Sequence, residues 1–323
     1  MAKSRVAIIG LGLIGGSMGL ALKKAKLDVE VVGHDKNSNT AGRALKRGAV
    51  DKTEWNLHSA CSGAGLVVLA LPLFGVKETL AALKDSLLPG AIVTDTATTK
   101  VPVMDWARDL APGVEFVGGN PALSVRRMGG GHGIDAADAD LFQGATYALM
   151  ASPTAAPVAI ETMTNFVALL GAKPYFIDPA EHDGLMAGVQ HLPALMATAL
   201  SAATIRSQGW KEMGKLAGAD FRTATDLTPQ DAKTGREQFL AHRDDLLRWL
   251  DVIQEQLHDL RGMVERGDAD GLEKLIESLS GEKDKWLSGN LEESGTSVDW
   301  QSTQSSIGRI FLGGLADRGK RPK

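Results

Sequence analysis

A glycine-rich turn near the amino terminus carries the clearest chemical signal of the chain. The segment Val6–Ser17 reads VAIIGLGLIGGS, in which an apolar strand enters the pattern GxGxxG and a helix leaves it. Gly10 permits the tight turn, Gly12 lets the backbone approach a pyrophosphate without a Cβ in the way, and Gly15 allows close packing of helix on strand. The amino end of the helix then stabilises the phosphates through its N–H groups and its positive dipole. The pattern predicts a dinucleotide site.

An acidic residue ends the second predicted strand, 20 residues after the last glycine of the pattern. This residue, Asp35, has the position from which a carboxylate binds the adenosine ribose, and a carboxylate there favours NAD over NADP. His34 and Lys36 beside it would accept a 2′-phosphate if Asp35 turned away, so NADP remains an alternative. The residues expected to bind the cofactor are Gly10, Gly12, Leu13, Ile14, Gly15, Asp35, Leu71 and Pro72.

Short apolar segments that alternate with helical patterns are expected to position this site. Such a βαβ rhythm predicts an α/β Rossmann fold, a doubly wound parallel sheet, over residues 1–178. A helix is expected over about Pro157–Leu170. The predicted strands are Arg5–Ile9, Val29–Gly33, Leu66–Leu71, Ala91–Asp95, Glu115–Gly118, Tyr147–Met150 and Lys173–Ile177.

Residues 179–290 show helical patterns only, which predicts an all-α second domain. Leu185–Arg206 is apolar nearly all round and is therefore expected to be buried, with a bend or interruption at Pro193. A later amphipathic helix carries an apolar stripe. Because these surfaces need more cover than the domain supplies, we expect a homodimer through it. Residues 291–323 are interpreted as a polar tail or docking arm. The stripe consists of Leu246, Leu250, Ile253, Leu257, Leu260 and Val264.

Composition excludes several function classes. Hydrophobic residues at 44% and charged residues at 23% are ordinary for a globular protein, and no apolar run reaches the roughly 18 residues of a membrane span. No signal-like segment opens the chain, so a cytoplasmic location is expected. The lone Cys61 forms no internal disulfide, and no metal site is predicted. The net charge of −4 argues against a nucleic-acid partner.

An ordered set of motifs resembles the prephenate/arogenate dehydrogenase family, the NAD(P)-linked enzymes of tyrosine biosynthesis. The resemblance covers about residues 5–290. It implies a Rossmann domain, a helical dimerisation domain and an oxidative decarboxylation in which hydride passes to nicotinamide. The motifs are Gly10–Ser17, Val68–Pro72, Val93–Asp95 with Lys100, Gly118–Pro121, Ala136–Gly144, and His182-Asp183 with His191–Pro193.

The substrate half of the chain departs from the family pattern at four positions. The resemblance implies a histidine base where this sequence has Asn120, and an amide cannot take a proton at neutral pH. A hydroxyl-bearing serine corresponds to Thr98. An arginine that clamps substrate corresponds to Asp226, which reverses the charge. A second histidine corresponds to Ala194. We therefore expect nicotinamide-dependent chemistry, but weak prephenate oxidation.

Three hypotheses follow from these departures. In the first, the base of a prephenate or arogenate dehydrogenase has moved to His191 or, less favourably, His132. In the second, a paralogue acts on another small acid or an imine, with Arg126 or Arg127 as anion anchor and Lys100 as proton donor. In the third, the protein binds dinucleotide without catalysis and uses the helical domain and the tail to engage a partner. The candidate catalytic residues are His191, Asn120, Thr98 and Lys100.

Overall fold

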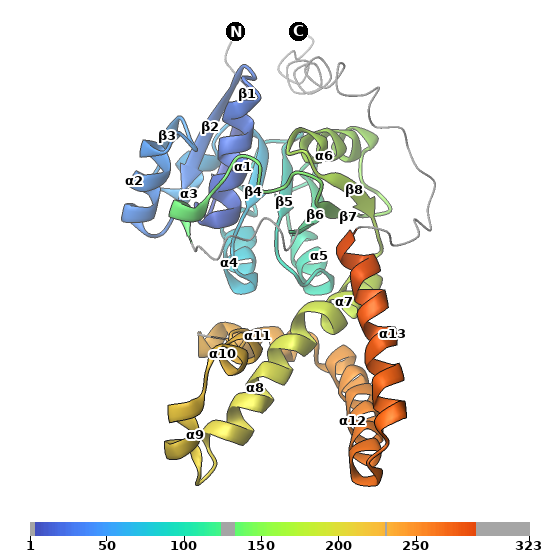
Figure 1. Ribbon diagram of the computed structural model, residues 1–323. Helices are drawn as coiled ribbons and strands as arrows, with labels where there is room; N and C mark the ends of the chain where they lie inside the picture. Colours follow the sequence, from blue (N-terminus) through green and yellow to red (C-terminus); the bar gives the residue numbers. More distant parts are fainter. Residues whose placement is uncertain (1–3, 124–132, 230, 289–323) are drawn as a thin grey trace, which may run out of the picture. The chain divides into compact units, whose positions relative to one another are not determined.

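The computed structural model describes residues 4–123, 133–229 and 231–288. The chain separates into two compact units, with the division after Met186. The first unit is an α/β fold and the second is helical (Figure 1).

The first unit contains, among its described residues, an eight-stranded sheet in the order β3-β2-β1-β4-β5-β6-β7-β8 (Figure 1). The seven strands predicted from sequence are present, and the two-residue β3 was missed because so short a segment shows no alternation. The strands are β1 Ser4–Ile9, β2 Val29–His34, β3 Lys52–Thr53, β4 Ala64–Leu69, β5 Ile92–Asp95, β6 Glu115–Ala122, β7 Thr146–Ala151 and β8 Lys173–Phe176.

One strand pair corrects the expectation of a parallel sheet. The pairs formed among β1 to β6 are parallel, and so is the pair of β7 and β8, but β6 and β7 run antiparallel, with Gly119 opposite Leu149. The reason is the connection between them. Its described part holds a single 3-10 turn, Ile134–Ala136, instead of the crossover helix that a parallel pair requires.

Helices cover both faces of the sheet, and the strands are accordingly apolar on both sides. Along β1, Val6 and Ile8 belong to one buried cluster, whereas Ala7 and Ile9 belong to the other. Cys61 is buried in the second cluster, and burial raises the pKa of its thiol to about 12. The helices of this unit are α1 Leu13–Lys24, α2 Ser38–Lys46, α3 Leu57–Cys61, α4 Leu73–Leu83, α5 Val101–Ala107, α6 Pro157–Leu169 and α7 Pro179–Met186.

The second unit is helical, and a π-turn at Ala187–His191 precedes α8, so the interruption expected near Pro193 is confirmed. The long amphipathic helix is also confirmed as α12, which ends at Gly267 in the left-handed conformation and runs beside α13 (Figure 1). The helices are α8 Leu192–Ile205, α9 Trp210–Leu216, α10 Ala219–Thr225, α11 Ala232–Ala241, α12 Arg243–Arg266 and α13 Ala269–Ser288.

The expectation that the apolar helix is buried is wrong for the single chain. In α8 only Leu192 and Ala197 are buried, and Leu200 and Ile205 are exposed. A helix that is apolar all round needs other apolar groups packed against every side. The neighbouring helices of this unit cover only a few of its residues. By length and composition alone, Pro179–Ile205 could also cross a membrane, but one such helix is weak support because core helices of soluble proteins have the same composition.

Candidate active site

The glycine loop joins β1 to α1 at the carboxyl edge of the sheet. Gly10 has a φ of +92°, and a Cβ on it would lie 2.3 Å from the carbonyl oxygen of Ala70. A Cβ on Gly15 would lie 2.0 Å from the carbonyl oxygen of Gly10. A Cβ on Gly12, in contrast, would meet no atom within 4 Å. The first and third glycines are thus required by the fold, whereas the second keeps a space open at the amino end of α1, where a pyrophosphate fits.

Asp35 follows β2 and is tied to the glycine loop. One carboxylate oxygen accepts the backbone N–H of Leu11 at 2.8 Å, and the other accepts the N–H of Asn37 at 2.8 Å. These bonds hold the carboxylate at the edge of the sheet with lone pairs left over for ribose hydroxyls. His34 and Lys36, the residues predicted to accept a 2′-phosphate in the NADP alternative, have other partners. His34 Nδ1 lies 2.9 Å from the carbonyl oxygen of Glu54, and Lys36 forms an exposed ion pair.

The two cofactor candidates after β4 also lie at this edge. Pro72 caps the amino end of α4, and the Leu71 side chain lies beside Gly10. Leu13 and Ile14 form the first turn of α1 and are partly buried against the core.

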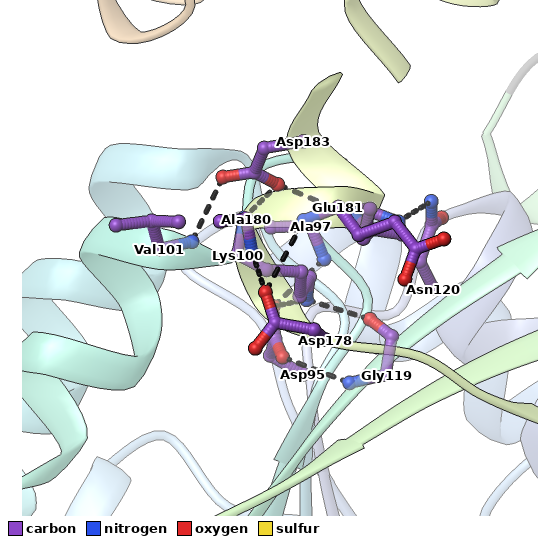
Figure 2. A network of polar contacts seen from close by, with 11 residues as sticks. Asp95, Ala97, Lys100, Val101, Gly119, Asn120, Asp178, Ala180, Glu181 and Asp183 are labelled. Carbon is purple, nitrogen blue, oxygen red and sulfur yellow. Dashed lines mark hydrogen bonds and ion pairs between the residues drawn. The ribbon is translucent and has the colours of Figure 1, made fainter. Parts of the chain in front are cut away.

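A second cluster at the ends of β5 and β6 surrounds a fully buried lysine. Nζ of Lys100 lies 2.5 Å from Asp95 Oδ2 and donates to the carbonyl oxygen of Gly119 at 2.7 Å (Figure 2). Asp95 in turn accepts the N–H of Gly119 at 3.2 Å and that of Ala97 at 2.9 Å. Burial lowers the pKa of Lys100, and Asp95 opposes this shift. The ion pair therefore fixes the backbone just before Asn120.

The double glycine before Asn120 is required by this packing. A Cβ on Gly119 would lie 2.7 Å from the carbonyl oxygen of Asp95 and 2.9 Å from the ring of Tyr147. Tyr147 is fully buried, and burial, followed by the charge of Asp95, raises the pKa of its hydroxyl. Only a residue without a side chain lets β6 approach β5 and β7 this closely.

Asn120 belongs to a buried row of three polar side chains. Nδ2 of Asn120 lies 2.9 Å from Nε2 of His182, and Nδ1 of His182 lies 3.0 Å from Oδ1 of Asp183. None of the three residues is more than 5% exposed. The carboxylate of Asp183 also accepts the backbone N–H groups of Lys100 and Val101 at 2.7 and 2.8 Å (Figure 2).

The hydrogen bonds of this row determine the roles of its atoms. A carboxylate only accepts, so Nδ1 of His182 carries the proton and donates it to Asp183. Nε2 then has a lone pair and accepts the amide N–H of Asn120. The result is a neutral imidazole in one tautomer, held by a carboxylate that α5 orients, as in other sites where a second partner orients a histidine.

The candidate residues from sequence are only partly brought together. Lys100 and Asn120 meet through Gly119, and Thr98 is half-buried in the loop between β5 and α5. His191 belongs to the helical unit, where its ring stacks on that of His242 with the centroids 4.2 Å apart. The other base and anchor candidates, His132, Arg126 and Arg127, lie outside the described residues, as does the segment 291–323.

Sequence reasoning did not include His182 among the candidate site residues. The pair His182-Asp183 was noted as a family motif but was given no function. The available signal was a histidine followed by an aspartate, together with an amide at the position where a base is expected. Among the residues that the structure describes, no group of three His, Cys, Asp or Glu could hold a metal ion.

Comparison with known proteins decides the family. Residues 18–176 match the family model for the nucleotide-binding domain of prephenate dehydrogenase, and residues 178–278 match its dimerization domain. The chain belongs to the prephenate dehydrogenase family. The glycine loop lies just before the first matched residue, so its assignment depends on the geometry given above.

Individual members of the family agree with this assignment. Prephenate dehydrogenase of Bacillus subtilis (strain 168) is 30% identical over 87% of this chain and 76% of its own. The structure of Synechocystis arogenate dehydrogenase is 27% identical, with a TM-score of 0.70 over 87% of this chain and 99% of that one. Prephenate dehydrogenase of A. aeolicus, in complex with hydroxyphenyl propionate and NAD+, shares the fold at 22% identity, with a TM-score of 0.75 over 89% and 99%. This protein is a dehydrogenase of that family.

Proposed function

We propose that this protein is an NAD-dependent dehydrogenase of tyrosine biosynthesis that oxidatively decarboxylates a cyclohexadienyl acid of the prephenate and arogenate class. The observation that carries the proposal is the match of residues 18–278 to both domains of one dehydrogenase family. The named activities of the Bacillus subtilis and Synechocystis relatives support the substrate class. A cytoplasmic location is part of the same proposal.

The cofactor half of the site fits NAD. Gly12 leaves open the space that a Cβ would fill, and the amino end of α1 faces it. Asp35 stands where it accepts hydrogen bonds from ribose hydroxyls and repels a 2′-phosphate. When bound, the oxidised nicotinamide supplies the acceptor for a hydride. The protein's task is then to hold the substrate hydroxyl and to exclude water, for which the buried row at the end of β6 is suited.

The substrate half supports a preference within the class. Asn120 can orient a hydroxyl but cannot accept its proton, and the loss of a general base typically slows a reaction about 10²- to 10⁴-fold. By resemblance, Asp226 replaces an arginine that anchors the substrate carboxylate. Arogenate carries an ammonium group where prephenate carries a ketone. A carboxylate at this position therefore repels bound arogenate less than it repels bound prephenate. We therefore expect arogenate to be oxidised faster than prephenate.

The family model that matches the helical unit is a dimerization domain. The surface of this unit fits such a dimer. Leu200 and Ile205 on α8, and Leu257 and Val264 on α12, are exposed in the single chain. Isolated apolar residues at a surface are ordinary, but rows of them along two helices favour burial against a partner. We propose that a second copy of the chain covers these rows, and that no membrane does.

Spectrophotometric detection of NADH tests the function. The protein is mixed with NAD and with prephenate, arogenate or a panel of other small acids, and NAD binding is measured separately by calorimetry. Turnover of arogenate or prephenate supports the proposal. Turnover of another acid alone would favour the paralogue, and NAD binding without turnover of any substrate would favour a non-catalytic role.

The variant Asn120→His separates two causes of slow prephenate oxidation. If the missing base is the main defect, the variant should oxidise prephenate faster than the wild type and recover part of the roughly 10²- to 10⁴-fold loss in rate. If the anchor has been rebuilt around Asp226, the single change should do little. Wild-type prephenate turnover of about 1 s⁻¹ or more, as ordinary enzymes show, would contradict the expectation of weak oxidation.

A further inference from the structure

The amide of Asn120 has two different ends, and the structure determines which end faces inward. Its nitrogen Nδ2 donates to His182, so its oxygen Oδ1 must face the other way. Within the described part of the chain, no N–H or O–H group donates to this oxygen. The oxygen lies at the carboxyl end of β6, at the same edge of the sheet as the glycine loop, because β1, β4, β5 and β6 are parallel.

We propose that His182 is a positioning residue, which holds the amide of Asn120 so that its carbonyl oxygen accepts the hydrogen bond of the substrate hydroxyl. The inference rests on the proposed function, since that function supplies the hydroxyl. It gives Asn120 a defined task at the position where the family carries a base: the amide aligns the hydroxyl without removing its proton.

The orientation depends on Asp183. Both of its oxygens accept backbone N–H groups from the start of α5, so the carboxylate cannot turn. It therefore holds the proton of His182 on Nδ1 and leaves the lone pair on Nε2. A flipped amide would place Oδ1 of Asn120 against that lone pair, with two acceptors 2.9 Å apart and no proton between them. Such an unmade bond in a buried site is unfavourable.

The arrangement depends on an acceptor at position 182. A leucine at this position would offer no lone pair to the amide N–H of Asn120, so nothing would hold the oxygen of Asn120 toward the substrate hydroxyl. A glutamine would restore an acceptor through its side-chain oxygen.

A pair of matched ligands isolates this hydrogen bond. Hydroxyphenyl propionate and phenylpropionate differ only in the hydroxyl, so the ratio of their dissociation constants reports on it. Both are titrated calorimetrically into the full-length protein with saturating NAD, for the wild type and for variants at positions 120 and 182.

The expected ratio follows from an ordinary hydrogen bond. A net contribution of about 0.5–1.5 kcal/mol makes the hydroxyl ligand bind about 2- to 12-fold more tightly to the wild type. In His182→Leu position 182 no longer accepts from Asn120, so this advantage should vanish. In His182→Gln the side-chain oxygen can still accept from Asn120, so the advantage should persist. In Asn120→Ala it should be lost.

Each outcome has a definite meaning. An advantage that persists in His182→Leu, or that His182→Gln loses, would overturn the positioning role. If His182→Leu does not fold, His182→Gln and Asn120→Ala still decide the matter. If neither ligand binds while NAD does, the proposed function fails and this inference fails with it, which differs from binding without a hydroxyl advantage.

Discussion

Gly12→Val should abolish dinucleotide binding and leave the fold intact. The backbone at Gly12 has a φ of −74°, which any residue adopts, and a Cβ there meets no protein atom within 4 Å. The new side chain would therefore occupy only the space at the amino end of α1, where the pyrophosphate must approach the backbone.

The size of the loss can be worked out from the first turn of α1. The first N–H bonded within the helix is that of Gly16, to the carbonyl oxygen of Gly12, which leaves the N–H groups of Leu13, Ile14 and Gly15 to face a ligand. If the valine side chain prevents two of these three N–H groups from reaching charged phosphate oxygens, at about 1.5–3 kcal/mol per hydrogen bond, the binding free energy falls by about 3–6 kcal/mol. This corresponds to a dissociation constant for NAD about 10²- to 10⁴-fold higher.

Calorimetric titration with NAD measures the affinity, and thermal unfolding without NAD measures the stability. Gly15→Ala is the matched control, because its Cβ would lie 2.0 Å from the carbonyl oxygen of Gly10 and should lower the unfolding temperature. Unchanged NAD affinity in Gly12→Val would refute the assignment of the cradle. A similar loss of stability in both variants would refute the claim that Gly12 is held open for a ligand.

Asp35→Ser should shift the ratio of NADP to NAD dissociation constants toward NADP by removing the repulsion of the 2′-phosphate, and a wild type that already prefers NADP would contradict this. Lys100→Met should lower the free energy of unfolding in urea by about 3–5 kcal/mol, because it leaves Asp95 charged and unpaired in the core. Light scattering at micromolar concentration should give twice the mass of one chain; a monomer would contradict the dimer. Cys61 should not react with thiol reagents at pH 8 in the folded protein, since burial raises its pKa to about 12.

Much of the α/β unit could be predicted from sequence because its strands are apolar on both faces and flanked by turns. Seven strands were placed within a few residues. β3 could not be found because two residues form no pattern. The direction of β7 could not be found either, because strand direction depends on where the connecting chain runs. The burial of α8 was misjudged because apolar composition shows that cover is needed and says nothing of which chain provides it.

The candidate site divides in the same way. The glycine loop and Asp35 could be predicted because the motif is local in sequence and its geometry follows from chain connectivity. The row of Asn120, His182 and Asp183 could not, because residues 62 positions apart meet only when α7 packs on α5. Sequence showed that a base was missing at position 120, but a contact between distant segments has no periodicity from which to predict its partner.

The two edges of the sheet have a consequence for association between molecules in a crowded solution. An open edge of unpaired N–H and C=O groups invites strands of other molecules to add to it. Here one edge is β3, with only two residues, and the other is β8, with Pro174 inside a strand of four. Proline offers no N–H, and Lys173 beside it is charged, so neither edge can template a continuous ladder. The half-exposed Tyr175 and Phe176 lie on that same short strand. Replacing Pro174 would therefore expose a strand with aromatic residues and create a starting point for fibrous aggregation.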